Sequence, residues 1–240
     1  MFAFRPHSFE RLAYGNGDPT LATISFPSSI TQPAVAPKSA AQAIVKRAED
    51  IVIALALLAV LAVPMLVVGI MIRLESAGPA LFRQERIGLH GRRFVLLKFR
   101  TMYHAAENTA GWHQARRGDP RVTRFGAFLR RTSCDELPQL LNVLAGSMSM
   151  VGPRPHAPGT CAGGLPFEYV TRRYAARHCV KPGMTGLAQV RGWRGETDTK
   201  EKLLHRLDSD LEYIATRSVG VDLMILCRTT VAVAGMLNAY

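Results

Sequence analysis

The stretch RTSCDELPQLLNVLAGSMSMVGPRPH, from Arg131 to His156, is the most informative part of this chain. It places two adjacent carboxylates, Asp135 and Glu136, shortly before Pro138. Proline is tolerated in the first turn of a helix and clashes further in, so we expect the helix that carries QLLNVL to begin at or just after Asp135. Both acids would then lie at a helix N-terminus, where backbone N–H groups and the helix dipole favour negative charge, including phosphate.

The same stretch ends in Gly152-Pro153-Arg154-Pro155, which holds an arginine between two rigid residues. A nucleophilic carboxylate and a fixed guanidinium near one helix end are what phosphoryl transfer requires. A plainer alternative stays open, because Ser133 and Glu136 have the S-x-x-E spacing of a capping box. The acids would then only start a helix, although Pro138 would fall in its second turn at a cost of about 3 kcal/mol.

The uncharged segment IVIALALLAVLAVPMLVVGIMI, from Ile51 to Ile72, has the length of a membrane helix. About 22 residues at 1.5 Å each give roughly 33 Å, enough to cross a bilayer core. Pro64 near its middle kinks or breaks the helix. Basic residues flank both ends, Lys46 and Arg47 before it and Arg73 after it, whereas a simple span concentrates positive charge on one side. Two membrane topologies are open, a helix that bends and returns to the same face and an ordinary kinked span. A buried core helix is a third option, disfavoured because the segment has no polar face.

Composition limits the classes of partner. The 240-residue chain has a formal net charge of +12 and four cysteines without CxxC or metal spacing. A basic surface suits nucleic acid, an anionic membrane face or phosphorylated substrates, and the cysteines are expected to be free thiols. Residues 1–45 are rich in Pro, Ser, Ala and Thr, which predicts a disordered tail. We expect one domain over residues 46–240, with residues 46–74 as the membrane helix and residues 80–240 as a cytosolic and interfacial part.

The remaining pattern predicts an α+β fold that is mostly α. Residues 80–102 predict a β-hairpin, and the cations Lys98 and Arg100 at the end of its second arm could hold a phosphate or form a solvated edge. Residues 201–217 predict an amphipathic helix, and residues 219–237 an apolar helix at the membrane interface or in the core. Residues 189–197 combine arginines and a tryptophan with glycines, a composition that can grip an anion and stack on a flat ring but also occurs in exposed turns.

From about Lys46 to its C-terminus, the chain resembles the bacterial sugar transferases, or monotopic phosphoglycosyl transferases. The resemblance rests on the broken apolar helix and on long motifs in the right order: KFRTM at Lys98–Met102, DPRVTRFG at Asp119–Gly126, LRRTSCDELPQLLNVLAGSMSMVGPRPH at Leu129–His156 and KPGMTGLAQVRGWRGETDT at Lys181–Thr199. GWRGETDT and PRPH are most similar to short members that start exopolysaccharide repeat units with glucose or galactose. The chain departs from the family pattern at Val63, Cys134 and Arg191, where Ser, Leu and Asn are common, and the last departure leaves the sugar open.

The resemblance implies a reaction and its residues. A hexose 1-phosphate would move from UDP-glucose or UDP-galactose to undecaprenyl phosphate with release of UMP, through a covalent phosphosugar-aspartate intermediate, as the first membrane step of exopolysaccharide or glycoconjugate synthesis. Asp135 matches the nucleophile, Glu136 completes the dyad, and both would bind Mg²⁺. The substrate-binding residues implied are Lys98, Arg100, Arg130, Arg154, Gln189, Arg191 and Arg194.

The resemblance also implies a location. The helix broken at Pro64 would be re-entrant in the bacterial inner membrane, with the catalytic part facing the cytoplasm. The bilayer would be a partner, nucleic acid would not, and a homodimer is compatible with the family. The alternative is a membrane-tethered basic binding protein without catalysis. It is disfavoured because the cations punctuate apolar elements and accompany an acid pair, whereas nucleic-acid arms are contiguous basic runs.

Overall fold

The computed structural model describes residues 39–104 and 118–235, all within one unit of the chain, Gln32–Tyr240. Helices dominate these residues, and their strands form three two-stranded sheets. The expected α+β, mostly helical class is therefore confirmed. The disordered tail expected over residues 1–45 lies outside the described residues up to position 38.

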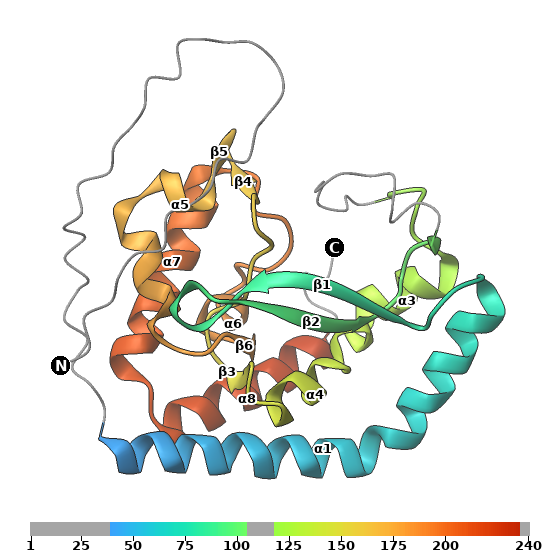
Figure 1. The fold of residues 1–240 in the computed structure, drawn as a ribbon, viewed down its shortest axis with the longest axis horizontal. Helices are drawn as coiled ribbons and strands as arrows, with labels where there is room; N and C mark the ends of the chain where they lie inside the picture. Colours follow the sequence, from blue (N-terminus) through green and yellow to red (C-terminus); the bar gives the residue numbers. More distant parts are fainter. Residues whose placement is uncertain (1–38, 105–117, 236–240) are drawn as a thin grey trace. The chain divides into compact units, whose positions relative to one another are not determined.

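The long apolar helix α1 runs from Ala40 to Glu75. Ser39 caps it by accepting a hydrogen bond from a backbone N–H of the first turn at 3.3 Å, so the helix begins before the expected boundary at Lys46. Residues 40–45 belong to this helix and not to the tail. Figure 1 shows α1 bent between its two halves, and Pro64 lies inside it. Proline removes a backbone hydrogen bond and explains the bend.

Helix α1 carries the membrane signal. Among the described residues it is the one helix long and apolar enough to cross a membrane, and 6% of its most apolar window is buried in the protein. Its exposed side chains include Val52, Val60, Val63, Leu66 and Ile70. A continuous apolar surface of this kind marks contact with lipid. The protein is therefore membrane-associated.

The expected hairpin is confirmed. Strands β1 (Leu81–Ile87) and β2 (Arg93–Phe99) pair antiparallel, and the register joins the first residue of each to the last residue of the other. A short 3-10 turn, Leu89–Gly91, connects them. The hairpin places Lys98 next to the elements that follow in the sequence.

Short elements make up most of the rest of the fold. In chain order they are α3 (Arg124–Thr132), η2 (Cys134–Glu136), α4 (Gln139–Leu144), β3 (Ser149–Val151), β4 (Cys161–Ala162), β5 (Leu165–Pro166), α5 (Phe167–Val170), η3 (Arg172–Cys179), β6 (Gly183–Thr185), α6 (Leu187–Val190), α7 (Lys200–Thr216) and α8 (Val219–Ala234). Strands β3 and β6 pair in parallel, and β4 and β5 pair antiparallel. Helix α7 confirms the amphipathic pattern, because its Leu203, Leu207 and Ile214 are buried.

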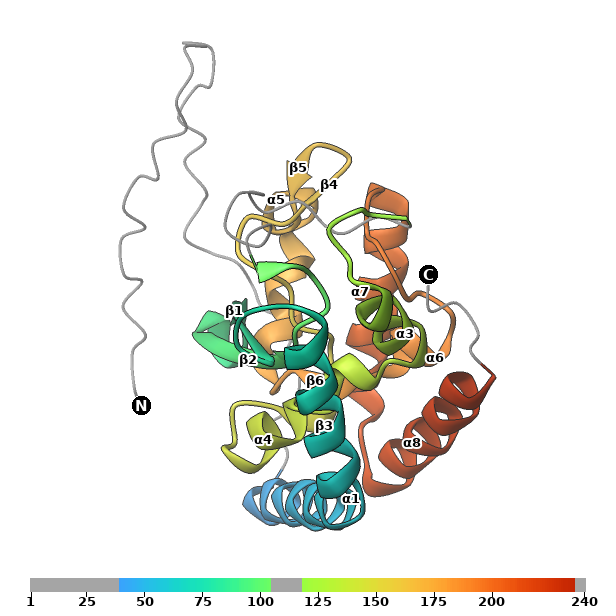
Figure 2. The same cartoon turned by 90° about the vertical axis from the view of Figure 1, so that its right-hand side faces the viewer.

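Both halves of α1 pack on this unit. Ala54, in the first half, joins a core shared by α4, β3, α7 and α8, the last through Ile225. Ile72, in the second half, joins a separate core with Phe99 of β2 and Leu129 of α3. Figures 1 and 2 show the second half of α1 rising toward the hairpin after the bend. The two ends of the apolar helix therefore contact the same folded part of the protein.

Candidate active site

Asp135 and Glu136 lie on a turn between two helices. After α3 ends, Ser133 adopts a left-handed backbone conformation with φ of 58°, and Cys134–Glu136 form a single 3-10 turn. The side chain of Ser133 does not cap this turn, which argues against the capping box as the reason for the acid pair. The two carboxylates are presented on a short, sharply folded link.

Helix α4 begins at Gln139, directly after Pro138. The expectation that this helix begins at or just after Asp135 is therefore wrong. Backbone N–H groups of the preceding turn already donate to carbonyl oxygens within it, at 3.2 and 3.3 Å. The negative charge of the acid pair is consequently balanced by cationic side chains and not by a helix N-terminus.

Glu136 is held by two cations. Arg154 Nη1 donates to Oε2 at 3.0 Å, and its Nη2 donates to Oε1. Lys98 Nζ donates to Oε1 at 2.9 Å. Burial alone would raise the pKa of Glu136, but Arg154 and Lys98 outweigh it and hold that pKa well below its usual range. Glu136 is a fixed, fully ionised carboxylate.

Asp135 has a different environment. Its Oδ2 lies 3.9 Å from Lys98 Nζ, beyond hydrogen-bond distance, and the residue is 8% exposed. Burial raises the pKa of Asp135, and Lys98 is the strongest influence that lowers it. Two neighbouring carboxyl groups with pKa values pushed in opposite directions are typical of a division of chemical roles. Asp135 is the reactive candidate and Glu136 the fixed anion.

Further arginines surround Arg154. Arg86 of β1, Arg194 and Arg206 of α7 each interact electrostatically with it, and Arg86 and Arg194 also with Glu136. Burial lowers the pKa of Arg86 and of Arg206 to about 10, so both remain charged at neutral pH. Such a concentration of positive charge around one carboxylate suits a further anion, and phosphate groups are the natural partners of arginine.

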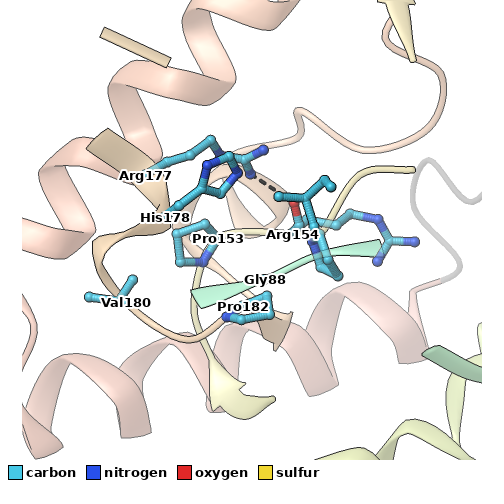
Figure 3. Close-up of a pocket in the computed structure, with 9 residues that line it drawn as sticks. Gly88, Pro153, Arg154, Arg177, His178, Val180 and Pro182 are labelled. Carbon is cyan, nitrogen blue, oxygen red and sulfur yellow. Dashed lines mark hydrogen bonds between the residues drawn. The ribbon is translucent and has the colours of Figure 1, made fainter. Parts of the chain in front are cut away.

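The backbone that carries Arg154 is fixed on both sides. Gly183 donates its backbone N–H to the carbonyl of Pro153 at 3.0 Å, and a Cβ on Gly183 would lie 2.1 Å from the backbone nitrogen of Gly152. The close approach of β6 to the end of β3 therefore requires glycine. Arg177 Nη2 donates to the carbonyl oxygen of Arg154 at 2.7 Å, as Figure 3 shows beside a small pocket.

Arg177 belongs to a buried polar network behind the Pro-Arg-Pro loop. It pairs with Asp210 of α7 at 2.7 Å and donates to the hydroxyl of Tyr174 at 2.7 Å. That hydroxyl contacts Nδ1 of His156 at 3.0 Å, and Nε2 of His156 lies 3.0 Å from Glu168. Burial lowers the pKa of His156, although Glu168 opposes the effect. The histidine therefore adds no positive charge at neutral pH.

Helix α7 fixes the glycine-rich segment of residues 189–197. Trp193 stacks on His205, with ring centroids 4.5 Å apart, so one face of the indole is already covered. Arg206 donates to the carbonyl of Gly195 at 2.7 Å. Arg194, between these contacts, has a long contact to the Ser133 hydroxyl at 3.4 Å. The structure thus brings Arg194 beside the acid turn, as the sequence predicts.

Two other predicted residues have clear positions near the hairpin. Arg130 Nε donates to the hydroxyl of Thr101 at 2.8 Å, and its charge acts on Asp135. Arg100 is 2% exposed and donates to the carbonyl and hydroxyl oxygens of Ser76 at 2.6 and 3.0 Å. In this conformation Arg100 caps the C-terminus of α1 and is covered by protein.

The two remaining predicted residues are engaged elsewhere. Gln189 is buried and its Nε2 donates to the carbonyl of Met184 at 3.2 Å. Arg191 forms an exposed bidentate pair with Glu212 of α7, with both contacts at 2.6 Å. The sequence analysis missed Arg86, Arg177 and Arg206. Each is a cation within an otherwise ordinary strand or helix pattern, and no local signal distinguishes it from a solvated residue.

The geometry defines a class of protein. A carboxylate pair with unequal environments, ringed by arginines and attached to a long apolar helix, is typical of a membrane-associated protein that handles phosphate-bearing molecules. The chain belongs to the bacterial sugar transferase family, whose family model matches residues 41–236. The expected family and its enzyme class, the phosphoglycosyl transferases, are thereby confirmed at the level of the family.

Three relatives illustrate the similarity. A UDP-glucose:undecaprenyl-phosphate glucose-1-phosphate transferase of Escherichia coli is 48% identical over 193 residues, 80% of this chain and 41% of the relative. A protein of the same name from Caulobacter vibrioides is 50% identical over 198 residues, 81% of this chain and 72% of the relative. An exopolysaccharide production protein, PSS, of Rhizobium leguminosarum is 48% identical over 189 residues, 79% of this chain and 94% of the relative. The chain thus spans less than half of the first relative and most of the third.

Proposed function

We propose that this protein transfers glucose 1-phosphate from UDP-glucose to undecaprenyl phosphate and releases UMP. The names of the Escherichia coli and Caulobacter vibrioides relatives describe this reaction. The observation in this chain that supports it best is the unequal acid pair, with Glu136 held by Arg154 and Lys98 and Asp135 beyond hydrogen-bond distance of Lys98. UDP-galactose remains a second donor to be tested.

The proposed mechanism has two displacements. An oxygen of the Asp135 carboxylate forms a bond to the β-phosphorus of UDP-glucose, and the bond from that phosphorus to the bridging oxygen breaks, so that UMP leaves with the electron pair. An oxygen of undecaprenyl phosphate then attacks the same phosphorus, and the carboxylate of Asp135 is released unchanged. A covalent intermediate lets two anionic substrates use one site in turn.

Electrostatics supports this division of roles. The donor diphosphate and the acceptor phosphate repel each other and repel Asp135. Arg154 and Lys98 lie at the acid pair, and Arg86, Arg194 and Arg206 add positive charge around Arg154. Fixed cations that already face the developing charge need no reorganisation during the reaction.

The acid pair offers Mg²⁺ few free ligands. Both oxygens of Glu136 accept hydrogen bonds from Arg154 or Lys98, and no group of three acidic, histidine or cysteine side chains in the described residues is arranged to hold a metal ion. Mg²⁺ commonly uses one or two carboxylates together with substrate phosphates. Asp135 would therefore hold the ion with the donor phosphates, and Glu136 would join only after a cation moves away. The bound ion would neutralise phosphate charge.

We also propose that α1 is re-entrant and that the catalytic part faces the cytoplasm of the inner membrane. Two observations support this topology. The helix is bent, and its two halves join two cores of the same folded unit. A straight helix of 36 residues would be about 54 Å long and would carry one end across the bilayer. Helix α8 carries exposed Leu223 and Val231, which suits a location at the membrane interface.

The reaction is tested with radiolabelled donor. Wild-type protein, Asp135→Asn and the exposed control Glu85→Gln are incubated with Mg²⁺, undecaprenyl phosphate and either UDP-glucose or UDP-galactose. We expect lipid-linked product from UDP-glucose with the wild type and the control, and at least a thousandfold loss in Asp135→Asn. Omission of the acceptor should leave a hexose-phosphate adduct on the peptide that contains Asp135. Absence of product from the wild type, or full activity in Asp135→Asn, contradicts the proposal.

The topology is tested by labelling. A cysteine is placed at Ala41 or at Ala77, exposed positions at the two ends of α1, in a variant without the four native cysteines. A membrane-impermeant reagent applied to intact cells should label neither position, and both should react after the cells are lysed. Labelling at Ala41 alone in intact cells would show a true span.

A further inference from the structure

The N-terminal end of α1 holds the helix that follows the acid pair. Arg47 Nη1 donates to the carbonyl of Val143 at 2.6 Å, and its Nη2 donates to the carbonyl of Leu144 at 2.8 Å. These carbonyls end α4, and a forked cation there satisfies acceptors that lack helical partners. Because Leu137 and Pro138 join α4 to the turn that carries Asp135, this contact fixes the helix that directly follows that turn.

The same end of α1 holds the strand that precedes Arg154. Asp50 is 2% exposed, and its Oδ1 accepts from the Ser149 hydroxyl and the Met150 backbone N–H, both at 2.9 Å. Both donors belong to β3, which leads directly into the Pro-Arg-Pro loop. Lys46 Nζ lies 2.8 Å from Asp50 and supplies the balancing charge.

Apolar side chains could fill the space that Lys46 and Asp50 occupy, so the presence of buried charges there needs a reason. Lys46 lies 2.8 Å from Asp222 of α8 as well as from Asp50, and both acids are buried. Buried ion pairs are often no more stable than apolar side chains of similar volume, whereas they do specify one arrangement of the elements they join. Here the charges join α1, β3 and α8, and Asp50 bonds directly to the backbone of the strand before Arg154.

The C-terminal end of α1 holds the other side of the site. Arg100, two positions after Lys98 in the chain, donates to Ser76 just beyond the end of α1. Glu75 accepts a hydrogen bond from the backbone N–H of Phe125 at 2.9 Å. Phe125 lies in the first turn of α3, the helix that carries Arg130. Lys98 and Arg130 are therefore tied to the opposite end of the same apolar helix.

We propose that α1 sets the geometry of the active site, with Arg47 and Asp50 as positioning residues. Its first end fixes the part that carries Asp135 and Arg154, and its second end fixes the part that carries Lys98 and Arg130. The two sets of contacts lie at the two ends of one bent helix, so the bend in α1 sets how the two parts of the site are placed relative to each other. This inference rests on the proposed function only for its activity readout.

The positioning role of α1 is tested in lipid nanodiscs with paired variants. Asp50→Ala removes the acceptor, and Asp50→Asn keeps an oxygen for the two donors on β3. Arg47→Met removes the fork, and Arg73→Met is the control, an exposed basic residue of the same helix. Two quantities are measured, the steady-state kcat for UMP release and the hydrogen exchange of residues 147–156.

We expect Asp50→Ala and Arg47→Met to lower kcat at least tenfold and Asp50→Asn to restore it to within about threefold of the wild type. Exchange in residues 147–156 should rise in Asp50→Ala more than exchange in α7 does, and the loss of kcat, measured well below Tm, should exceed what the lower Tm explains. Unchanged exchange in that segment overturns the inference, as does a loss of kcat that follows Tm alone. If the wild type releases no UMP, the proposed function fails, and the exchange result still decides whether α1 positions the loop.

Discussion

Arg154 and Glu136 meet through two parallel contacts, Nη1 to Oε2 at 3.0 Å and Nη2 to Oε1, so the arginine that we propose binds phosphate already holds a carboxylate. Glu136 both orients this guanidinium and repels an incoming diphosphate. Glu136→Gln removes the repulsion and weakens the orientation. We expect KM for UDP-glucose to fall or stay constant while kcat falls at least tenfold. Steady-state kinetics of UMP release measure both values.

A matched variant separates charge from position. Glu136→Asp keeps the charge but shortens the side chain, so it should lose kcat without a fall in KM. A rise in KM for Glu136→Gln, with kcat unchanged, would show that Glu136 contributes to binding and not to orientation.

The pH dependence of activity should depend on Lys98. Asp135 acts as an anion in the proposed mechanism, and burial raises its pKa, so activity is lost as the pH falls through that raised value. Lys98 is the strongest influence that lowers the pKa of Asp135. Lys98→Met therefore raises this pKa further and moves the acid limb of kcat/KM to higher pH. The pH at which the acid limb lies can be measured even though Lys98→Met lowers the rate at every pH.

The control for this measurement is Arg83→Met, an exposed cation of the same hairpin. Its acid limb should coincide with that of the wild type. An acid limb that stays in place or moves to lower pH in Lys98→Met would contradict the assignment of the limb to Asp135.

The elements predicted correctly from the sequence are those with strong local patterns. The apolar run and Pro64 predict α1 and its bend, although not its start at Ala40, and the pattern of residues 80–102 predicts the hairpin. The start of α4 differs from the prediction, because a 3-10 turn before Pro138 takes up the backbone hydrogen bonds there. No local sequence rule distinguishes such a turn from the first turn of a helix.

The cationic side chains of the site show a second limit of prediction from the sequence. Lys98 and Arg154 stand in recognisable motifs, and the structure brings both to Glu136. Arg177 reaches the same region from another part of the chain, through tertiary packing that a local pattern does not contain. Arg100 has the right motif, yet packing turns it toward Ser76 and the end of α1. A motif therefore indicates which residues surround a site but not the direction in which each side chain points.

Arg191 and Arg194 lie three positions apart, and their substitution should have different effects on kcat/KM. Arg191 forms an exposed pair with Glu212, and such surface pairs contribute at most about 1 kcal/mol. Arg194 lies beside Arg154 and Glu136, and burial lowers its pKa. We expect Arg194→Ala to reduce kcat/KM at least tenfold and Arg191→Ala to change it less than threefold. The opposite order would move the nucleotide or sugar contact to Arg191.

Arg177 should contribute to catalysis beyond its contribution to stability. It pairs with buried Asp210 at 2.7 Å and donates to the carbonyl oxygen of Arg154 at 2.7 Å. Arg177→Met leaves Asp210 as an uncompensated buried charge, which costs about 3–5 kcal/mol of unfolding free energy. Adding Asp210→Leu removes that charge and should recover most of the loss in Tm. The double variant still lacks the donor to Arg154, so kcat, measured well below Tm, should stay at least tenfold below the wild type. Recovery of kcat together with Tm would reduce Arg177 to a stabilising residue.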